Sequence, residues 1–537
     1  MELEGKSMIG ARRAEARGEV FHAANPQTGE KLDPGYSSAS ADDVNEAVQL
    51  AAGAAAEYGA RTGKEKGAFL REIAAQMEKR ADAIVARATQ ETALPAARIQ
   101  SELGRTCNQL RFFAGIVEEG SWAMARIDRA DPQRRPLPKP DLRSMLRPLG
   151  PVAVFCASNF PLAFSVAGGD TASALAAGNP VVVKAHPAHP GTAELAGEAI
   201  RDAARNCEIP EGVFSLLFDA GNFAGGELVR HPLIKAVGFT GSRAGGRALM
   251  KIAESRSEPV AFYAEMSSVN PVFILPGALR ERREAIAEGL FGSATTGAGQ
   301  FCTKPGVVLL EDGEAGRGLA QSLAERFAAA PEFALLTSGI QTAYASGTRA
   351  RAQEPGVRKT AAGAPIQGSG FGAQAALFET DAATYLAHDD LGAEIFGPET
   401  LLVYHSKHDD ILEIARRLEG HLTATIHGTE EDLRNYADLV AILETKAGRL
   451  IFNGFPTGVE VCHAMVHGGP FPATSDGRTS SVGGQAIYRF TRPVCFQGFP
   501  QAALPVELQD ANPLGILRQV DGKWTRDALG ASSRAAS

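Results

Sequence analysis

Apolar residues along the first 125 positions recur at three- and four-residue spacing, the periodicity of helices that pack on a core. Glycine and proline separate these periodic segments at Gly59, Gly63 and Pro95. The pattern predicts helices over residues 42–58, 64–91 and 96–125. The stretch that follows is rich in proline and charge, which is typical of an extended excursion rather than of a helix.

Between residues 151 and 265 the pattern changes to short apolar runs that alternate with helical segments. The runs predict strands at 152–156, 181–184, 213–218, 236–240 and 260–264, with helices at 169–177, 192–206, 224–230 and 244–254. Such alternation indicates right-handed crossovers and a parallel sheet, which places ligands at the carboxyl ends of its strands. Asn159, Lys184, the turn at 240–242 and Glu265 all follow strands at that edge.

A second alternation of strands and helices runs from residue 272 to 452 and predicts a second α/β domain. The last 50 residues are rich in loops, with strand-like pieces at 486–490 and 492–498. Residues 149–169 carry no charge and are nominally long enough to span a membrane. Prolines and glycines interrupt this run, so it predicts a buried strand, a turn and the start of a buried helix.

The chain has 537 residues, a length that indicates roughly two to four domains. Its net charge of −8 gives no general attraction to nucleic acid, and its N-terminus has no secretory signal. The six cysteines are scattered and show neither CxxC nor zinc spacing. We therefore expect a cytoplasmic protein with no membrane, nucleic-acid or metal partner.

No GxGxxG motif follows a strand, but the run AVGFTGSRAGG ends a strand at Gly241 and Ser242 and begins a helix at once. Such a turn suits the binding of a phosphate, but on its own it is better explained as an ordinary tight turn. Lys184 ends the run NPVVVK, where a sugar or phosphate could lie, but a solvated side chain is the favoured interpretation of an isolated lysine.

Cys302 lies in the glycine-rich loop TTGAGQFCTKP, whose backbone N–H groups suit a thiolate that forms an oxyanion beside itself. A free thiol titrates near ~8.5, so the site must lower this pKa or supply a base. Only Lys304 offers a positive charge nearby, and a buried inert cysteine is the alternative. Glu265 ends an apolar run that would raise its pKa toward that of a general base, unless water reaches it.

Taken in order, these motifs resemble the aldehyde dehydrogenase superfamily over nearly the whole chain. The matching segments are SNFPL (158–162), VVVK (181–184), FTGS (239–242), the Glu265 strand, GQFCT (299–303) and EIFGP (394–398). The resemblance implies an α/β fold with a Rossmann-like cofactor domain (1–126 and 149–265) and an α/β catalytic domain (266–480). It further implies a small β oligomerisation flap with a C-terminal extension (127–148 and 481–537) and a homodimer or homotetramer.

The resemblance also assigns catalytic roles. Cys302 would attack the aldehyde to form a thiohemiacetal and then a thioester, while Asn159 and the Cys302 backbone N–H hold the oxyanion. Glu265 would activate the water that hydrolyses the thioester. A dehydrogenase that passes its acyl group to coenzyme A usually lacks that glutamate, and a non-catalytic binding protein would be expected to lose these residues.

The cofactor residues follow from the same resemblance. Lys184, with His186 beside it, would contact the adenine ribose, and Gly241 with Ser242 the pyrophosphate. Glu394 would bind the nicotinamide ribose, with Phe396 packed nearby. Many members that prefer NAD have a glutamate where this chain has Pro187. Its absence removes repulsion of a 2′-phosphate, so we expect NADP as the cofactor, with NAD as the alternative.

Two longer segments, 158–192 and 458–476, resemble the branch of α-ketoglutarate semialdehyde (2,5-dioxopentanoate) dehydrogenases and bacterial NADP-dependent fatty-aldehyde dehydrogenases. In that branch a histidine approaches the catalytic centre, and His463 matches it better than His467; a structural histidine is the alternative. We expect oxidation of 2,5-dioxopentanoate, or else of a medium- or long-chain aliphatic aldehyde.

The substrate pocket is less defined by the sequence. Four aromatic side chains are expected to line an apolar tunnel, namely Phe160, Phe164, Phe301 and Phe471. The carboxylate of an α-keto acid semialdehyde also needs a cation, and the sequence assigns that role to no particular arginine.

Overall fold

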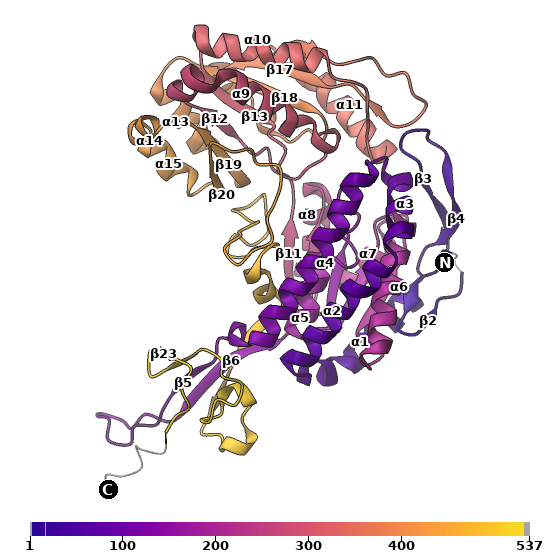
Figure 1. Ribbon diagram of the computed structural model, residues 1–537, viewed down its shortest axis with the longest axis vertical. Helices are drawn as coiled ribbons and strands as arrows, with labels where there is room; N and C mark the ends of the chain where they lie inside the picture. The colour runs from indigo at the N-terminus through magenta and orange to yellow at the C-terminus, as the bar shows by residue number, and fades with distance from the viewer. Residues whose placement is uncertain (1–2, 17, 531–537) are drawn as a thin grey trace.

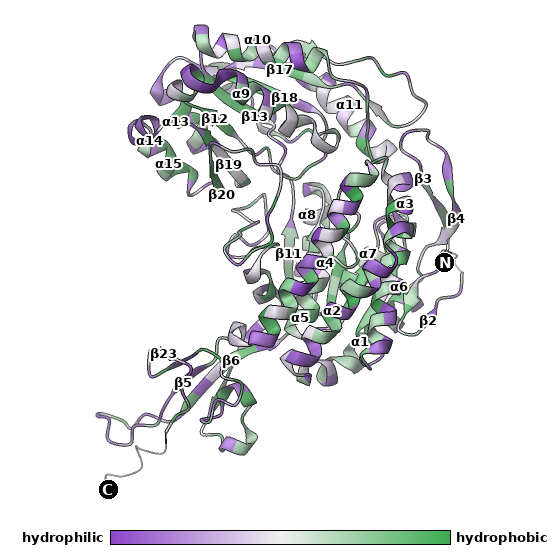
Figure 2. Cartoon of the chain, in the orientation of Figure 1, coloured by the Kyte–Doolittle hydropathy of each residue, from purple (hydrophilic) through white to green (hydrophobic). Residues whose placement is uncertain are grey.

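The computed structural model describes residues 3–16 and 18–530, which form two α/β bodies and a narrow β extension (Figure 1). The first body carries the N-terminal half of the chain, and the second carries most of the orange and pink segments in Figure 1. Hydrophobic residues gather on the strands of both bodies, while hydrophilic ones dominate the outer faces of the helices (Figure 2). Each body therefore has a sheet at its centre.

The first sheet comprises β1 (Met8–Ile9), β2 (Arg12–Arg13), β7 (Val152–Phe155), β8 (Val181–Lys184), β9 (Phe214–Leu217), β10 (Ala236–Thr240) and β11 (Ala261–Glu265). Its order is β11-β10-β7-β8-β9-β1-β2, with β7 to β11 parallel and β1 and β2 antiparallel. Numbered along the chain, the parallel strands stand in the nucleotide-binding order 3-2-1-4-5. Ligands of such sheets bind where the order reverses, which is between β7 and β10 here.

The helices of this body are α1 (Ala41–Ala60), α2 (Gly63–Lys79), α3 (Ala81–Thr92), α4 (Ala96–Glu119), α5 (Gly169–Ala177), α6 (Pro190–Asn206), α7 (Phe223–Arg230) and α8 (Arg243–Glu254). They cover the sheet on both faces, with α1, α7 and α8 on one and α4, α5 and α6 on the other. Alternate residues of β7 face the two layers, Val154 toward α5 and Phe155 toward α7.

Two predicted helices end earlier than expected. The segment 64–91 divides at Arg80, whose φ of −104° and ψ of 10° end α2 and begin α3. Arg80 pairs with Asp202 of α6, and the bend lets α3 pack against α4 and α6. The helix α4 ends at Gly120, which has a left-handed φ of 85° and closes the helix as glycine commonly does.

The second sheet comprises β12 (Val272–Ile274), β13 (Val307–Glu311), β15 (Arg358–Ala362), β17 (Ala376–Asp381), β18 (Glu399–His405), β19 (His421–His427) and β20 (Ala447–Phe452). Its order is β15-β17-β18-β13-β12-β19-β20, and all but the edge strand β15 are parallel. Its helices are α9 (Pro276–Thr295), α10 (Glu314–Ala328), α11 (Ser338–Gln353), α12 (Ala382–Ala387), α13 (His408–Arg417), α14 (Glu430–Asn435) and α15 (Ala437–Leu443). The second α/β alternation expected from the sequence is present.

The extension is a sheet of β21 (Thr491–Gln497), β6 (Leu142–Pro148), β5 (Arg126–Asp128), β22 (Arg518–Val520) and β23 (Lys523–Thr525), in that order. Two small sheets complete the fold: β3 (Val20–Ala24) with β4 (Lys31–Ser37), and β14 (Phe333–Ala334) with β16 (Gly372–Ala373). The extension thus pairs strands from residues 126–148 with strands from the C-terminal segment 491–525. The domain boundaries expected from the sequence stay a prediction.

One predicted strand is wrong. Residues 486–490 form part of a 3-10 helix (Gly484–Phe490), because Ala486, Ile487 and Phe490 are buried together against α5, a spacing that suits a helical turn. The uncharged run 149–169 folds as expected into β7, a turn and the start of α5. Within the described residues, no helix has the length and apolarity needed to cross a membrane.

Candidate active site

Two cavities meet at Cys302. The larger has a volume of about 880 Å³ and lies at the carboxyl ends of β7, β8, β10 and β11. The smaller has a volume of about 480 Å³ and lies between α4, the turn after β7 and the loop 457–465. Cys302 lines both cavities, so its sulfur lies where groups bound in the two would meet.

The backbone before Cys302 is unusually bent. Gly297, Ala298 and Gly299 have left-handed φ angles of 60°, 58° and 67°. For Ala298 this conformation costs about 1 kcal/mol or more, since its Cβ crowds the following carbonyl. At Gly299 a Cβ would lie 2.2 Å from the carbonyl oxygen of Gly397, so only glycine fits. This loop therefore packs directly against the loop 394–398 of the second body.

Asparagine side chains hold the loop in place. Asn270 donates from Nδ2 to the carbonyl oxygens of Cys302 and Lys304, at 2.9 and 3.0 Å. Asn159, in the turn after β7, donates to the carbonyl oxygen of Gln300 at 2.9 Å. An asparagine amide has two N–H donors, so the second of Asn159 remains for a ligand. The structure thus brings Asn159 to Cys302, and it adds Asn270, which no sequence pattern indicated.

Glu265 ends β11 and is buried, with both carboxylate oxygens engaged. Oε1 accepts a hydrogen bond from His467 Nε2 at 2.9 Å, and Oε2 accepts one from Ser481 Oγ at 2.7 Å. Burial raises the pKa of Glu265, but the charge and hydrogen bond of His467 and the hydrogen bonds from Ser481 and Cys302 outweigh it, so the pKa lies below its ordinary value. The expectation of a raised pKa is wrong for this reason, and the carboxylate is ionised at neutral pH.

The surroundings of Cys302 disfavour its thiolate. Burial raises the pKa of the Cys302 thiol well above its ordinary value, and the adjacent Glu265 carboxylate raises it further. Lys304, the positive charge nearest in sequence, instead forms a buried ion pair of 2.6 Å with Glu399. Cys302 is therefore a thiol at rest, and a base must take its proton before it attacks.

The histidine at the sulfur is His467, not His463. His467 is buried, and its Nε2 lies 3.6 Å from Cys302 Sγ. His463 is exposed, with its ring 4.8 Å from that of Phe112. The prediction for His463 is wrong in position, because the chain turns inward only after Val466. The glycine pair at 468–469 is the feature of the sequence that could have indicated close packing beside His467. A Cβ at Gly468 would lie 2.4 Å from a carbonyl oxygen, and one at Gly469 would lie 2.2 Å from another.

Ligand atoms of Cys302, Glu265 and His467 all lie within 4.8 Å of one another. Such a set could hold a metal ion, but the mutual hydrogen bonds already account for the arrangement. His467 Nδ1 is buried with no hydrogen-bond partner among the described residues. Nε2 of His467 donates to the Glu265 carboxylate, which leaves Nδ1 as the ring nitrogen without a partner in the described part of the chain.

The larger cavity contains the residues expected to bind a dinucleotide. Ser242 caps α8, its Oγ accepting from Gly245 N at 3.1 Å, and Gly241 beside it is exposed. Lys184 donates from Nζ to the carbonyl oxygen of Asp219 at 3.0 Å, and burial lowers its pKa. His186 also lines the cavity, and burial lowers its pKa so far that it is neutral.

The second body contributes the opposite wall of the larger cavity. Glu394 and Phe396 both face it, from the loop that packs against Gly299. Burial raises the pKa of Glu394 to about 7, although the Ser267 hydroxyl and the Ser268 N–H lower it. Residues of α11 also line this wall, although no sequence pattern predicted their place there. The larger cavity therefore lies between the two bodies.

The smaller cavity has an aromatic wall. Phe160 lies 5.2 Å from Phe164 and 5.0 Å from Phe301, ring centre to ring centre, and all three line the cavity. Phe471 does not line it and is 53% exposed, so its predicted place is wrong. Its backbone carbonyl instead accepts from Gly420 N at 3.2 Å, which holds it at the surface.

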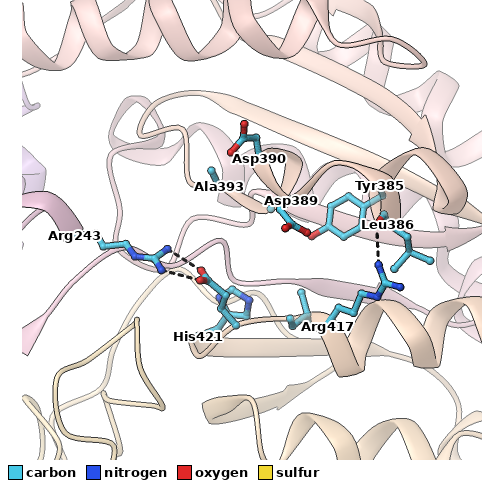
Figure 3. A pocket seen from close by; sticks show the side chains of 11 residues that line it. Arg243, Tyr385, Leu386, Asp389, Asp390, Ala393, Arg417 and His421 are labelled. Carbon is cyan, nitrogen blue, oxygen red and sulfur yellow. Dashed lines mark hydrogen bonds and ion pairs between the residues drawn. The ribbon is translucent and has the colours of Figure 1, made fainter.

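A third cavity of about 370 Å³ lies apart from these residues (Figure 3). Arg243 at the start of α8 reaches Glu419 across it with two hydrogen bonds, of 2.7 and 2.8 Å. Acidic and basic groups alternate around it, including Asp389 and Arg417. None of the residues predicted to act in catalysis lines this cavity, so we place no reaction there.

Comparison with known proteins gives matches over nearly the whole chain. The family model described as Aldehyde dehydrogenase family matches residues 13–486. Alpha-ketoglutaric semialdehyde dehydrogenase 2 of Azospirillum brasilense is 50% identical over 524 residues, covering 97% of this chain and 100% of that protein. Alpha-ketoglutaric semialdehyde dehydrogenase of Acinetobacter baylyi is 45% identical over 528 residues, covering 98% and 100%.

Solved structures match the architecture at lower identity. Lactaldehyde dehydrogenase from Escherichia coli has a TM-score of 0.80 at 20% identity, covering 92% of this chain and 98% of that one. An aldehyde dehydrogenase of Bacillus cereus, in a structure described as an NAD+ complex, has a TM-score of 0.79 at 20% identity, covering 92% and 96%. These matches establish the fold.

Proposed function

This chain belongs to the aldehyde dehydrogenase family and oxidises an aldehyde with NAD(P), and we propose that this aldehyde is α-ketoglutaric semialdehyde. The family and fold class expected from the sequence are confirmed. The observation that carries the proposal is Cys302, which lies where a dinucleotide-sized cavity meets a smaller, partly aromatic one. The names of the relatives that are 50% and 45% identical support the choice of substrate.

The first chemical step removes the thiol proton of Cys302. The thiol is hydrogen-bonded to Glu265, which is ionised and also accepts from His467. The proton passes to the Glu265–His467 pair, whose carboxylate oxygen and imidazole nitrogen lie 2.9 Å apart and can share it. The resulting thiolate adds to the aldehyde carbon, and the second N–H of Asn159 and the Cys302 N–H stabilise the alkoxide of the thiohemiacetal.

The second half of the reaction hydrolyses the thioester. The larger cavity would hold a nicotinamide that supplies a hydride acceptor, and the thiohemiacetal on Cys302 would become a thioester by loss of that hydride. Once the Glu265–His467 pair has released its proton, Glu265 takes one from water, which attacks the acyl carbon and frees the Cys302 thiolate. His467 and Ser481 position the Glu265 carboxylate for this step.

The larger cavity suits a dinucleotide. The N-terminus of α8, with Gly241 and Ser242 exposed, offers backbone N–H groups to a pyrophosphate. Lys184 would bind the adenine ribose, and Glu394 the nicotinamide ribose with Phe396 beside it. We propose NADP as the preferred form, because Pro187 lines the cavity where a carboxylate would repel a 2′-phosphate.

Reduced-cofactor absorbance with an aldehyde panel tests the proposal. The panel contains 2,5-dioxopentanoate, succinate semialdehyde, hexanal and decanal, each with NAD and with NADP. We expect the highest kcat/KM with 2,5-dioxopentanoate and NADP, unaffected by coenzyme A. A higher kcat/KM with decanal would favour a long-chain aldehyde dehydrogenase, and coenzyme A dependence would favour an acylating one.

The β extension supports an oligomer. Phe499, Val506, Leu514 and Trp524 are exposed near or on it. Among the described residues β21 pairs with β6 alone, which leaves its other edge unpaired. We propose that these surfaces pair in a homodimer or homotetramer, which light scattering after size exclusion will distinguish. A monomer would contradict the proposal. A cytoplasmic location stays a prediction.

A further inference from the structure

The smaller cavity carries positive charge opposite its aromatic wall. Arg105 enters it from α4 in the first body, and Arg449 from β20 in the second. Of the described residues that line it, Glu460 alone is acidic, and it is exposed. Burial lowers the pKa of both arginines; against it act Cys302 on both, and the carboxylates of Glu102, Glu460 and Glu265 on Arg105. Two cations from distant segments therefore converge near the reacting sulfur.

Arg105 is incompletely satisfied. Its Nη2 donates to the carbonyl oxygen of Val459 at 3.2 Å, and its guanidinium carbon lies 5.2 Å from the centre of the Phe164 ring. Its Nη1 is buried and has no hydrogen-bond partner among the described residues. A buried cationic N–H without an acceptor is costly, so this position favours a ligand that supplies a negatively charged oxygen.

Among the described residues, the guanidinium of Arg449 is hydrogen-bonded only to uncharged groups. Its Nη1 and Nη2 donate to the carbonyl oxygens of Gly458 and Pro456, at 3.1 and 2.8 Å. Its Nε is buried without a partner, and within the described residues its guanidinium forms no ion pair with a carboxylate. Burial lowers the pKa values of Arg449 and Arg105, which shows that both charges are poorly solvated.

We propose that Arg105 and Arg449 bind the carboxylate of the aldehyde substrate; this inference rests on the proposed function and deepens it. With the aldehyde carbon at Cys302, the two methylenes of a five-carbon α-keto semialdehyde lie along Phe160 and Phe301. The carboxylate then reaches the guanidinium groups, whose paired N–H donors match its geometry. Glu460 opposes this binding by repulsion, which limits the affinity at the mouth of the cavity.

Both arginines also hold the loop 456–459 through its carbonyl groups. A purely structural role and a role in binding the carboxylate predict different effects of removing them. If they only hold the loop, their removal affects charged and neutral aldehydes alike. If they bind the carboxylate, the loss is confined to aldehydes that carry one. The comparison needs substrates of equal length, namely 2,5-dioxopentanoate, 5-oxopentanoate and pentanal.

The test is steady-state kinetics of Arg105→Met and Arg449→Met with these three aldehydes. We expect each variant to lower the ratio of kcat/KM for 2,5-dioxopentanoate to that for pentanal by about 10- to 100-fold, mainly through KM. Arg105→Lys keeps the charge without the paired donors and should lose less. Arg111→Met is the matched control, because Arg111 lies on the same helix, is partly exposed and pairs with Glu78.

Thermal melting checks that each variant folds, and Arg105→Lys keeps the test valid if Arg105→Met does not. An unchanged ratio in both variants, or an equal loss for all three aldehydes, would overturn the inference. If the unmodified enzyme oxidises 5-oxopentanoate but not 2,5-dioxopentanoate, the proposed substrate is wrong. The arginine inference then still holds provided that both variants lose 5-oxopentanoate selectively.

Discussion

The two cavities that meet at Cys302 are built in different ways. The larger consists mainly of strand ends, glycines and a helix N-terminus, so backbone groups and small residues form it. The smaller consists of long side chains, aromatic on one side and cationic on another. We propose that the larger cavity binds the dinucleotide that members of this family share, which leaves the smaller cavity to vary with the substrate.

The two cavities also differ in charge. In the larger cavity the N-terminus of α8 at Ser242 offers partial positive charge, and burial raises the pKa of Glu394 to about 7. In the smaller cavity Arg105 and Arg449 carry full charges that burial leaves poorly solvated. Cys302 lies between them, and burial together with the Glu265 carboxylate raises its pKa, so it rests as a neutral thiol.

The largest expected effect comes from replacing Cys302, the residue that lines both cavities. Cys302→Ala should lower kcat/KM by at least about 10⁴-fold, because no other group can form the thioester. Dinucleotide affinity, measured by calorimetry, should stay within about threefold, since the larger cavity is unchanged. Cys495→Ala, an exposed cysteine on β21, is the control. Full activity of Cys302→Ala would refute the mechanism.

The next effect concerns the base beside the sulfur. His467→Asn should slow the pre-steady-state burst of reduced cofactor by about 100-fold at neutral pH, because the thiol proton loses its shared acceptor. His463→Asn should leave the burst rate unchanged, since His463 is exposed beside Phe112. Stopped-flow absorbance measures both. A slow burst in His463→Asn with a normal one in His467→Asn would reverse the assignment.

A change in the larger cavity alone should alter the cofactor and not the aldehyde. Pro187→Glu should shift the ratio of kcat/KM for NADP to that for NAD by about 30-fold toward NAD, through repulsion of the 2′-phosphate. KM for the aldehyde should not change. An unaltered cofactor ratio would show that position 187 does not face the 2′-oxygen.

The smallest effect is a pH dependence of cofactor binding. Burial raises the pKa of Glu394 to about 7, so its charged, hydrogen-bond-accepting form is present above that pH and is lost below it. KM for the dinucleotide should therefore rise about fivefold between pH 8 and pH 6. Glu394→Gln should have a flat profile. The same rise in that variant would assign the titration to another group.

The same contrast explains what the sequence could predict. The parallel strands of the first sheet are predicted within a residue or two, and Lys184, Gly241 and Ser242 lie at their ends, because both depend on local patterns. Lys184 is the last residue of β8, and Ser242 follows β10 by two residues. Local periodicity nonetheless hid the break at Arg80, where an ion pair with α6 turns the chain.

The smaller cavity could not be predicted in this way. Arg105 and Arg449 lie on separate bodies, and only tertiary packing brings them together. His463 and Phe471 were misplaced because the loop around residues 460–480 has no periodicity that tells inward from outward residues. His467 is directed inward by contacts of its backbone with Ser480 and Ser481, which no local motif marks.

The most direct test of the account traps the acyl-enzyme. In Glu265→Gln, His467 remains within 3.6 Å of the sulfur to take the thiol proton, so the thioester should still form but should hydrolyse slowly. Mixing with 2,5-dioxopentanoate and NADP should therefore give a burst of reduced cofactor. Acid quenching and peptide mass spectrometry should then find the acyl group on the peptide that contains Cys302. A burst without any adduct, or an adduct on another cysteine, would contradict the account.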